Sequence, residues 1–98
     1  MQPLLLLRAH TDLRLGLGHV ARALALHEAW SALGGSTCLA ISGDERARRV
    51  GAGQHPFQDQ PLPFEAVDLG ESLQAPLPET LKARASVVLV DQWDITPA

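Results

Sequence analysis

Two short runs in which every residue is apolar constrain the fold of this chain most. The first is Leu4 to Leu7, and the second is Val87 to Val90, which Asp91 follows directly. A segment that is apolar on both faces is typical of a strand inside a parallel sheet whose two faces are covered by helices. With 98 residues, the chain has room for one domain and one modest core.

A helical pattern follows the first run. From His19 onward apolar residues recur at three- and four-residue steps, and Gly34 and Gly35 end the pattern as residues that favour a helix C-terminus. The predicted buried stripe consists of Val20, Ala23, Leu24, Leu26, His27, Trp30 and Leu33. Further patterns predict a strand at 36–42, a short helix up to about residue 50, a loop at 51–63, a strand at 64–69, a helix at 79–84 and a strand at 86–90.

This alternation of strands and helices predicts an α/β fold with a partial doubly wound parallel sheet of the Rossmann-like type. The last predicted strand has no helix after it that would cover it. We therefore expect residues 1–98 to form a single, truncated N-terminal α/β domain.

Composition argues against several kinds of partner and location. The net charge is −3 and the basic residues form no long stripe, which argues against nucleic acid. The run from Leu4 to Leu7 is far shorter than the roughly 20 apolar residues of a membrane span, and no basic segment of a signal peptide precedes it. Cys38 is the single cysteine and sits in an apolar run, which predicts a buried thiol in a reducing compartment. We expect a cytoplasmic protein without a membrane span.

The segment from Ala9 to Gly18 has the composition of a loop between the first strand and the first helix. In open α/β sheets, ligands bind where such loops lead from strand ends into helix N-termini. Gly16 and Gly18 let the backbone turn tightly and approach a ligand, and the helix start favours anionic groups. His19 stands at that junction, where an imidazole suits a general base; a structural helix cap is the alternative interpretation.

Other polar residues complete the candidate site. Arg22 lies one turn after His19, where it would either influence the imidazole or face a phosphate. Asp91 ends an apolar strand and is predicted to line the cleft, with capping of a following helix as the alternative. Trp93 follows it as a candidate stacking residue. The remaining histidines are interpreted as structural, surface or loop residues: His10, His27 and His55.

Cofactor motifs are incomplete in this sequence. A dinucleotide fingerprint would place a third glycine at position 21, where Ala21 stands; alanine is tolerated there, so this interpretation stays open. The long loop before Gly16 and the lack of an acidic residue at the end of the second strand weaken it. No Gly-Lys-Ser/Thr occurs, which excludes a P-loop, and the four histidines lack metal-ligand spacing. We expect neither a cofactor nor a metal.

The stretch from Arg8 to Leu26, with Gly-Leu-Gly-His-Val-Ala-Arg at positions 16–22, resembles the opening of the UDP-sugar hydrolase of pseudaminic acid biosynthesis and its spore-coat polysaccharide relatives. In that family a short apolar strand and an Arg-x-Asp loop lead to Gly-x-Gly-His-x-x-Arg at a helix start. Val88 to Trp93 is similar to the family's apolar strand that ends in Asp-His-Tyr. A weaker similarity links the first loop to the glycosyltransferase of lipid II synthesis.

The resemblance implies the N-terminal half of a two-domain glycosyltransferase-B fold, with the C-terminal nucleotide-binding domain absent from this chain. It implies a UDP-sugar substrate and cleavage of the anomeric C–O bond, with water displacing UDP. By the same resemblance His19 is the catalytic residue, and the substrate-binding residues are Arg8, Gly16, Gly18, Arg22 and Asp91. Two positions depart from the family pattern: His10 replaces the loop aspartate, and Gln92 replaces the histidine after Asp91.

Three functions are therefore open at this point. The first is a fragment of a UDP-sugar hydrolase or glycosyltransferase. The second is a non-catalytic remnant or a sugar- or nucleotide-binding module on the same scaffold, which the departures at His10 and Gln92 motivate. The third is a nicotinamide- or flavin-binding domain that uses the loop for a pyrophosphate.

Overall fold

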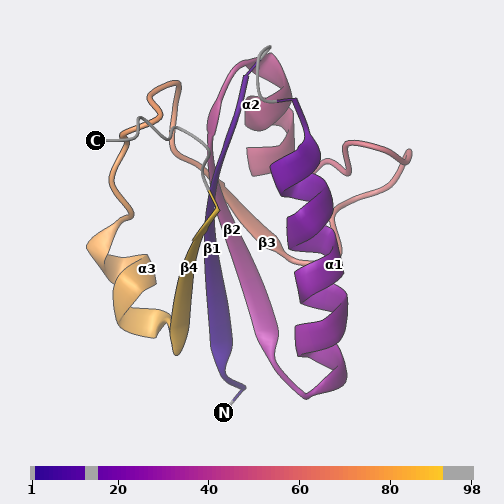
Figure 1. Ribbon diagram of the computed structural model, residues 1–98, viewed down its shortest axis with the longest axis vertical. Coiled ribbons are helices and arrows are strands. Elements are labelled where there is room, and N and C mark those ends of the chain that lie inside the picture. The colour runs from indigo at the N-terminus through magenta and orange to yellow at the C-terminus, as the bar shows by residue number, and fades with distance from the viewer. Residues whose placement is uncertain (1, 13–15, 92–98) are drawn as a thin grey trace.

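A computed structural model describes residues 2–12 and 16–91, without the side chain of Asp91, and shows a four-stranded, all-parallel sheet flanked by helices (Figure 1). The elements follow in the order β1 (Leu4–Thr11), α1 (Gly18–Ala32), β2 (Ser36–Gly43), α2 (Glu45–Gly51), β3 (Glu65–Asp68), α3 (Glu79–Arg84) and β4 (Val87–Asp91). The predicted α/β fold with a parallel sheet is confirmed, and it agrees with a Rossmann-like fold at this coarse level.

The strands lie in the order β3-β2-β1-β4, so β1 is flanked on both sides. From β1 the chain builds outward through β2 and β3, then crosses back to place β4 on the other side of β1. The order thus reverses between β1 and β4. In open α/β sheets the carboxyl ends of the strands at such a reversal form the preferred ligand-binding edge.

Strand β1 is longer than the sequence pattern predicts. It continues beyond Leu7 to Thr11, so the loop expected to begin at Ala9 was wrong for these residues. The backbone of β1 pairs with β2 as far as Thr11–Gly43 and with β4 as far as Ala9–Asp91. Pairing on both sides satisfies the backbone hydrogen-bonding groups and keeps the segment extended although it contains polar side chains.

Two layers of apolar side chains cover the two faces of the sheet. On one face, residues of β1 and β2 pack with Val20 and Ala23 of α1 and with Ala47 and Val50 of α2. On the other face, β1 and β2 pack against Leu81 of α3. Helices α1 and α2 therefore share one face, and α3 covers the opposite one.

The predicted stripe of α1 is only partly correct. Val20 and Ala23 are buried, and Leu24 and Trp30 pack against the core from partly buried positions. Leu26 is 36% exposed and Leu33 is 81% exposed, so neither belongs to the core. Leu33 follows the last residue of α1, where the chain turns toward β2 and the helical periodicity no longer sets the direction of the side chain.

Cys38 is fully buried in β2, as predicted. Among the described residues, no helix is both long and apolar enough to cross a membrane. Strand β4, in contrast, is an edge strand whose four apolar side chains remain 41% to 57% exposed: Val87, Val88, Leu89 and Val90.

Candidate functional site

The start of α1 lies at the carboxyl edge of the sheet, where the sequence places the candidate site. Helix α1 begins at Gly18, directly after Leu17, and no side chain caps its N-terminus. Gly16 adopts a positive φ of 66°, a conformation that favours glycine. At Gly18, a Cβ would meet no atom within 4 Å, so the space beside its backbone is open in the described structure.

His19 is buried, with 3% of its surface exposed, and its ring contacts Arg22 of the same helix. The distance from Nη2 of Arg22 to Nδ1 of His19 is 2.9 Å. Because a guanidinium can only donate hydrogen bonds, Nδ1 must be the acceptor, and a neutral ring then carries its proton on Nε2. In this arrangement His19 is a hydrogen-bond donor at Nε2, whereas the general base expected from the sequence would need an unprotonated nitrogen facing the substrate.

Arg8 lies on the other face of the sheet. Alternate residues of β1 face opposite sides, and Leu4 and Leu6 pack in the α3 layer, so Arg8 shares that side. Its Nη2 donates to the carbonyl oxygens of Leu73 and Ala75, both at 3.1 Å. Burial lowers the pKa of its guanidinium from the usual value. The structure thus does not bring Arg8 together with His19; its side chain holds the segment that precedes α3.

Asp91 reaches the same edge of the sheet as the start of α1. Its backbone pairs with Ala9 of β1, at the point where the strand order reverses. Its side chain, and all of Gln92 and Trp93, lie outside the described residues.

A second polar cluster at this edge, which joins β1 to β2, was missed by sequence reasoning. Nδ1 of His10 lies 2.7 Å from Oγ of Ser42, and Nε2 lies 3.4 Å from the carboxylate of Asp12. His10 is 5% exposed and Ser42 is fully buried, so this hydroxyl is not accessible to a substrate. The cluster supports the interpretation of His10 as structural. Parallel pairing places His10 opposite Ser42, a register that the sequence alone does not reveal.

Thr11 ends β1 on the face that carries α1. Its Oγ1 is the one buried side-chain polar atom without a hydrogen-bond partner in the described part of the chain. Its backbone is tightly packed, because a Cβ on Gly43 would lie 1.7 Å from the carbonyl oxygen of Thr11. The ends of β1 and β2 are therefore in close contact just before α2 begins.

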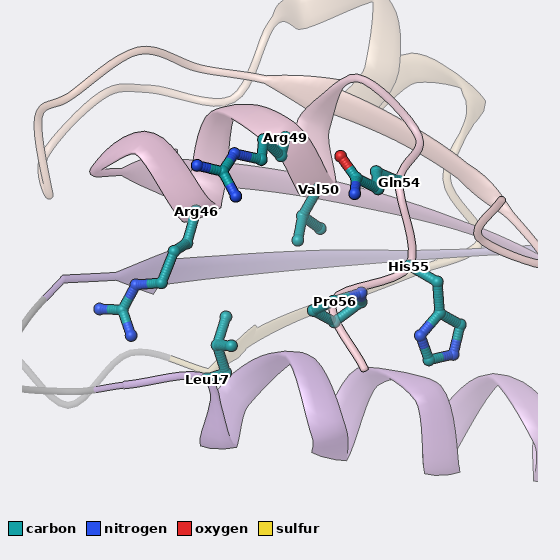
Figure 2. A pocket seen from close by; sticks show the side chains of 7 residues that line it. All are labelled: Leu17, Arg46, Arg49, Val50, Gln54, His55 and Pro56. Carbon is teal, nitrogen blue, oxygen red and sulfur yellow. The ribbon is translucent and has the colours of Figure 1, made fainter. Parts of the chain in front are cut away.

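A pocket of about 200 Å³ lies between the start of α1 and helix α2 (Figure 2). Leu17, Val50 and Pro56 supply apolar side chains to it. The polar lining consists of Arg46, Arg49, Gln54 and His55. In Figure 2 both guanidinium groups extend from α2 toward the end of the pocket where α1 begins.

A pocket of about 320 Å³ lies beyond β2 and β3 and is lined mainly by acidic side chains. Its lining residues are Gly43, Asp44, Glu45, Arg48, Asp68, Gly70 and Glu71. Within the described ranges, no group of three or more histidine, cysteine, aspartate or glutamate side chains is arranged to hold a metal ion.

Comparisons of the chain with known protein families, with curated proteins and with solved structures find no match.

Proposed function

We propose that this chain binds a nucleotide-activated sugar at the carboxyl edge of its sheet, as the sugar-side part of a UDP-sugar hydrolase or glycosyltransferase of the glycosyltransferase-B type. The observation that carries the proposal is the start of α1. There a helix N-terminus without a side-chain cap, the open space beside Gly18 and the His19–Arg22 pair come together at one edge.

The electrostatics of this helix start favour an anion. The aligned peptide dipoles of a 15-residue helix place partial positive charge at its N-terminus, and α1 has no acidic residue in its first turn to neutralise it. A diphosphate is a suitable ligand for such a position. The reversal of strand order between β1 and β4 supports the same location, because ligands of open α/β sheets bind at such reversals.

In the proposed reaction, water attacks the anomeric carbon, a new C–O bond forms, and the bond to the diphosphate oxygen breaks with UDP leaving with the electron pair. His19 acts as a hydrogen-bond donor through Nε2 and stabilises negative charge that develops on an oxygen of the leaving group. Arg22 is a positioning residue, because its contact with Nδ1 holds the ring in the donor form. The attacking water loses one proton to bulk water, so the products are the free sugar and UDP.

The test is UDP release from a panel of UDP-sugars by the full-length wild-type protein and by two variants of His19. His19→Ala removes the ring and should abolish UDP release, whereas His19→Gln keeps an N–H donor and should keep part of the activity. If the ring acts as a base instead, both variants should be equally inactive. Near-normal release by a folded His19→Ala variant would remove His19 from the mechanism.

One observation favours a second candidate, a sugar- or nucleotide-binding module without catalysis. His19 is only 3% exposed, so its ring is not offered to solvent in this structure. This candidate predicts that UDP-sugars raise the melting temperature of the protein while no UDP is released. A ligand-induced thermal shift accompanied by turnover would exclude it.

A further inference from the structure

We infer that the pocket between α1 and α2 is a binding site for a small phosphate-bearing molecule, and that Arg49 is the main residue that binds the phosphate. The inference concerns a pocket lined by α2 and the following loop, and it does not depend on the function proposed for His19.

The charge of the lining residues selects an anion. Two guanidinium groups line the pocket, from Arg46 and Arg49, and none of the described residues that line it is acidic. Figure 2 shows both groups extending toward the same end of the pocket. Planar guanidinium groups suit the tetrahedral oxygens of phosphate because each can donate two parallel hydrogen bonds.

The two arginines differ in how many of their N–H donors already contact a carboxylate. Arg46 donates to the carboxylate of Asp44 from both Nε and Nη2, at 3.2 and 3.0 Å. The nearest acidic contact of Arg49 is a loose one, with Nε at 4.0 Å from Glu45. Glu45 is itself held by Arg48 at 2.5 Å. Arg49 is therefore the guanidinium with most of its donors left for a ligand, while Asp44 already occupies part of the donors of Arg46.

His55 supplies a third polar group and is 8% exposed. The backbone N–H of Phe57 donates to its Nδ1 at 3.1 Å. A backbone amide can only donate, so a neutral His55 carries its proton on Nε2 and is also a hydrogen-bond donor. The polar lining thus consists of donors, together with the amide of Gln54.

The size and the apolar part of the pocket restrict the ligand further. A volume of about 200 Å³ exceeds what a single phosphate ion needs and is smaller than the pockets of roughly 300 Å³ or more that hold drug-sized ligands. The apolar side chains of Leu17, Val50 and Pro56 offer a surface for the body of an organic molecule. A small phosphate monoester, such as a sugar phosphate, fits both requirements.

The experiment is a calorimetric titration of the protein with inorganic phosphate and with glucose 1-phosphate, at constant ionic strength. We expect saturable binding of the ester with a Kd of about 1 mM or lower, and weaker binding of inorganic phosphate, which lacks the organic body. Arg49→Gln should weaken the binding of both ligands by at least about fivefold, because it removes charge-assisted hydrogen bonds.

Arg48→Gln is the matched control. Arg48 lies on the same helix, with its side chain 64% exposed against 59% for Arg49, and it lines the acidic pocket instead. Both variants lose one positive charge, so a general electrostatic effect would weaken binding equally in the two. Binding that is reduced only in Arg49→Gln supports the site. Equal losses in both variants, or no saturable binding by the folded wild-type protein, would overturn it.

The outcomes also separate this inference from the function proposed above. Specific phosphate binding without UDP release would support the binding site at Arg49 and contradict the proposed function. UDP release that depends on His19, together with no phosphate binding, would do the reverse.

Discussion

Arg22 donates a hydrogen bond from Nη2 to Nδ1 of His19 across 2.9 Å, and this contact decides which ring nitrogen carries the proton. The two residues are one helical turn apart, a spacing that brings their side chains together. The role proposed for His19 thus depends on a neighbour three residues away, and substitutions of Arg22 should alter that role without changing the imidazole itself.

The first prediction concerns the tautomer of His19. When the His19 ring is neutral, its ¹⁵N chemical shifts should show an unprotonated Nδ1 and a protonated Nε2. Arg22→Leu removes the donor and should allow a mixture of the two forms. A protonated Nδ1 in the wild-type protein would contradict the hydrogen bond and the donor role built on it.

The second prediction concerns Arg8, whose buried side chain holds the segment at 72–75. Arg8→Met leaves several carbonyl oxygens without a donor and should lower the free energy of unfolding by about 2–3 kcal/mol. Urea denaturation measures this loss, and proteolysis of the native protein should become faster in this segment. Arg48→Met, at an exposed position, is the control; similar losses in the two variants would show that the contacts of Arg8 add nothing.

The third prediction concerns the thiol of Cys38. Burial raises its pKa to about 11, and the negative charge of Glu65 adds to this effect, while Arg84 opposes it. At a pH near 8, only about one thiol in a thousand is then ionised, so alkylation should be slow and should follow unfolding of the protein. Glu65→Gln should lower the pKa. Alkylation of the native protein as fast as that of the unfolded chain would contradict this account.

The fourth prediction concerns the dependence of stability on pH. Oδ1 of Asp44 accepts the N–H groups of Arg46 and Ala47 at the start of α2. The hydrogen bond from the side chain of Arg46, followed by those of the backbone, lowers the pKa of Asp44 from its usual value. The unfolded chain therefore binds the proton more tightly. The resulting stability is complete above the unfolded pKa of about 4 and is lost as the pH falls through the folded pKa.

Asp44→Asn tests this dependence because asparagine keeps the capping oxygen but cannot ionise. At pH 7 the variant should be less stable by about 0.5–1 kcal/mol, and the difference should shrink toward zero as the pH approaches about 2. Asp59→Asn, in an exposed loop, is the control for the loss of one negative charge. A difference for Asp44→Asn that does not vary with pH would rule out the ionised carboxylate as its source.

The fifth prediction compares two buried threonines. Oγ1 of Thr11 has no partner in the described structure, whereas Oγ1 of Thr37 lies 2.8 Å from Nδ1 of His27. Thr11→Val should leave the melting temperature unchanged or raise it, since it removes an unpaired buried hydroxyl. Thr37→Val should lower the stability by about 1 kcal/mol. If Thr11→Val destabilises the protein as much, the hydroxyl of Thr11 has a partner after all.

Much of the fold could be predicted from periodicity and glycine positions. The bounds of α1 and β2 agree with prediction to within one residue, because the apolar pattern and Gly34 determine where each begins or ends. The end of β1 could not be predicted. Its polar residues, Arg8 and His10, look like loop residues until pairing with the neighbouring strands gives them buried partners.

The sequence could predict the part of the candidate site whose residues are neighbours in the chain, but not the part that folding brings together from distant segments. The glycines and His19 fall at one strand-to-helix junction, so their proximity follows from local sequence. The pocket between α1 and α2 depends on how the loop after α2 folds back. There the bridge between Gln54 and Pro61 and the hydrogen bond from His55 N–H to Gln60 O set the position of the loop. Composition shows only that this segment is a loop.

The edge strand β4 also affects how the protein behaves in concentrated solution. Its outer backbone groups have no neighbouring strand within the described sheet, and the side chains of Val87 to Val90 are about half exposed on both faces. Such an edge can pair with an additional strand, including one from another molecule of the same sequence. Preparations should therefore form larger species as the protein concentration rises. The substitution Val88→Lys should oppose this association and keep the preparations monodisperse.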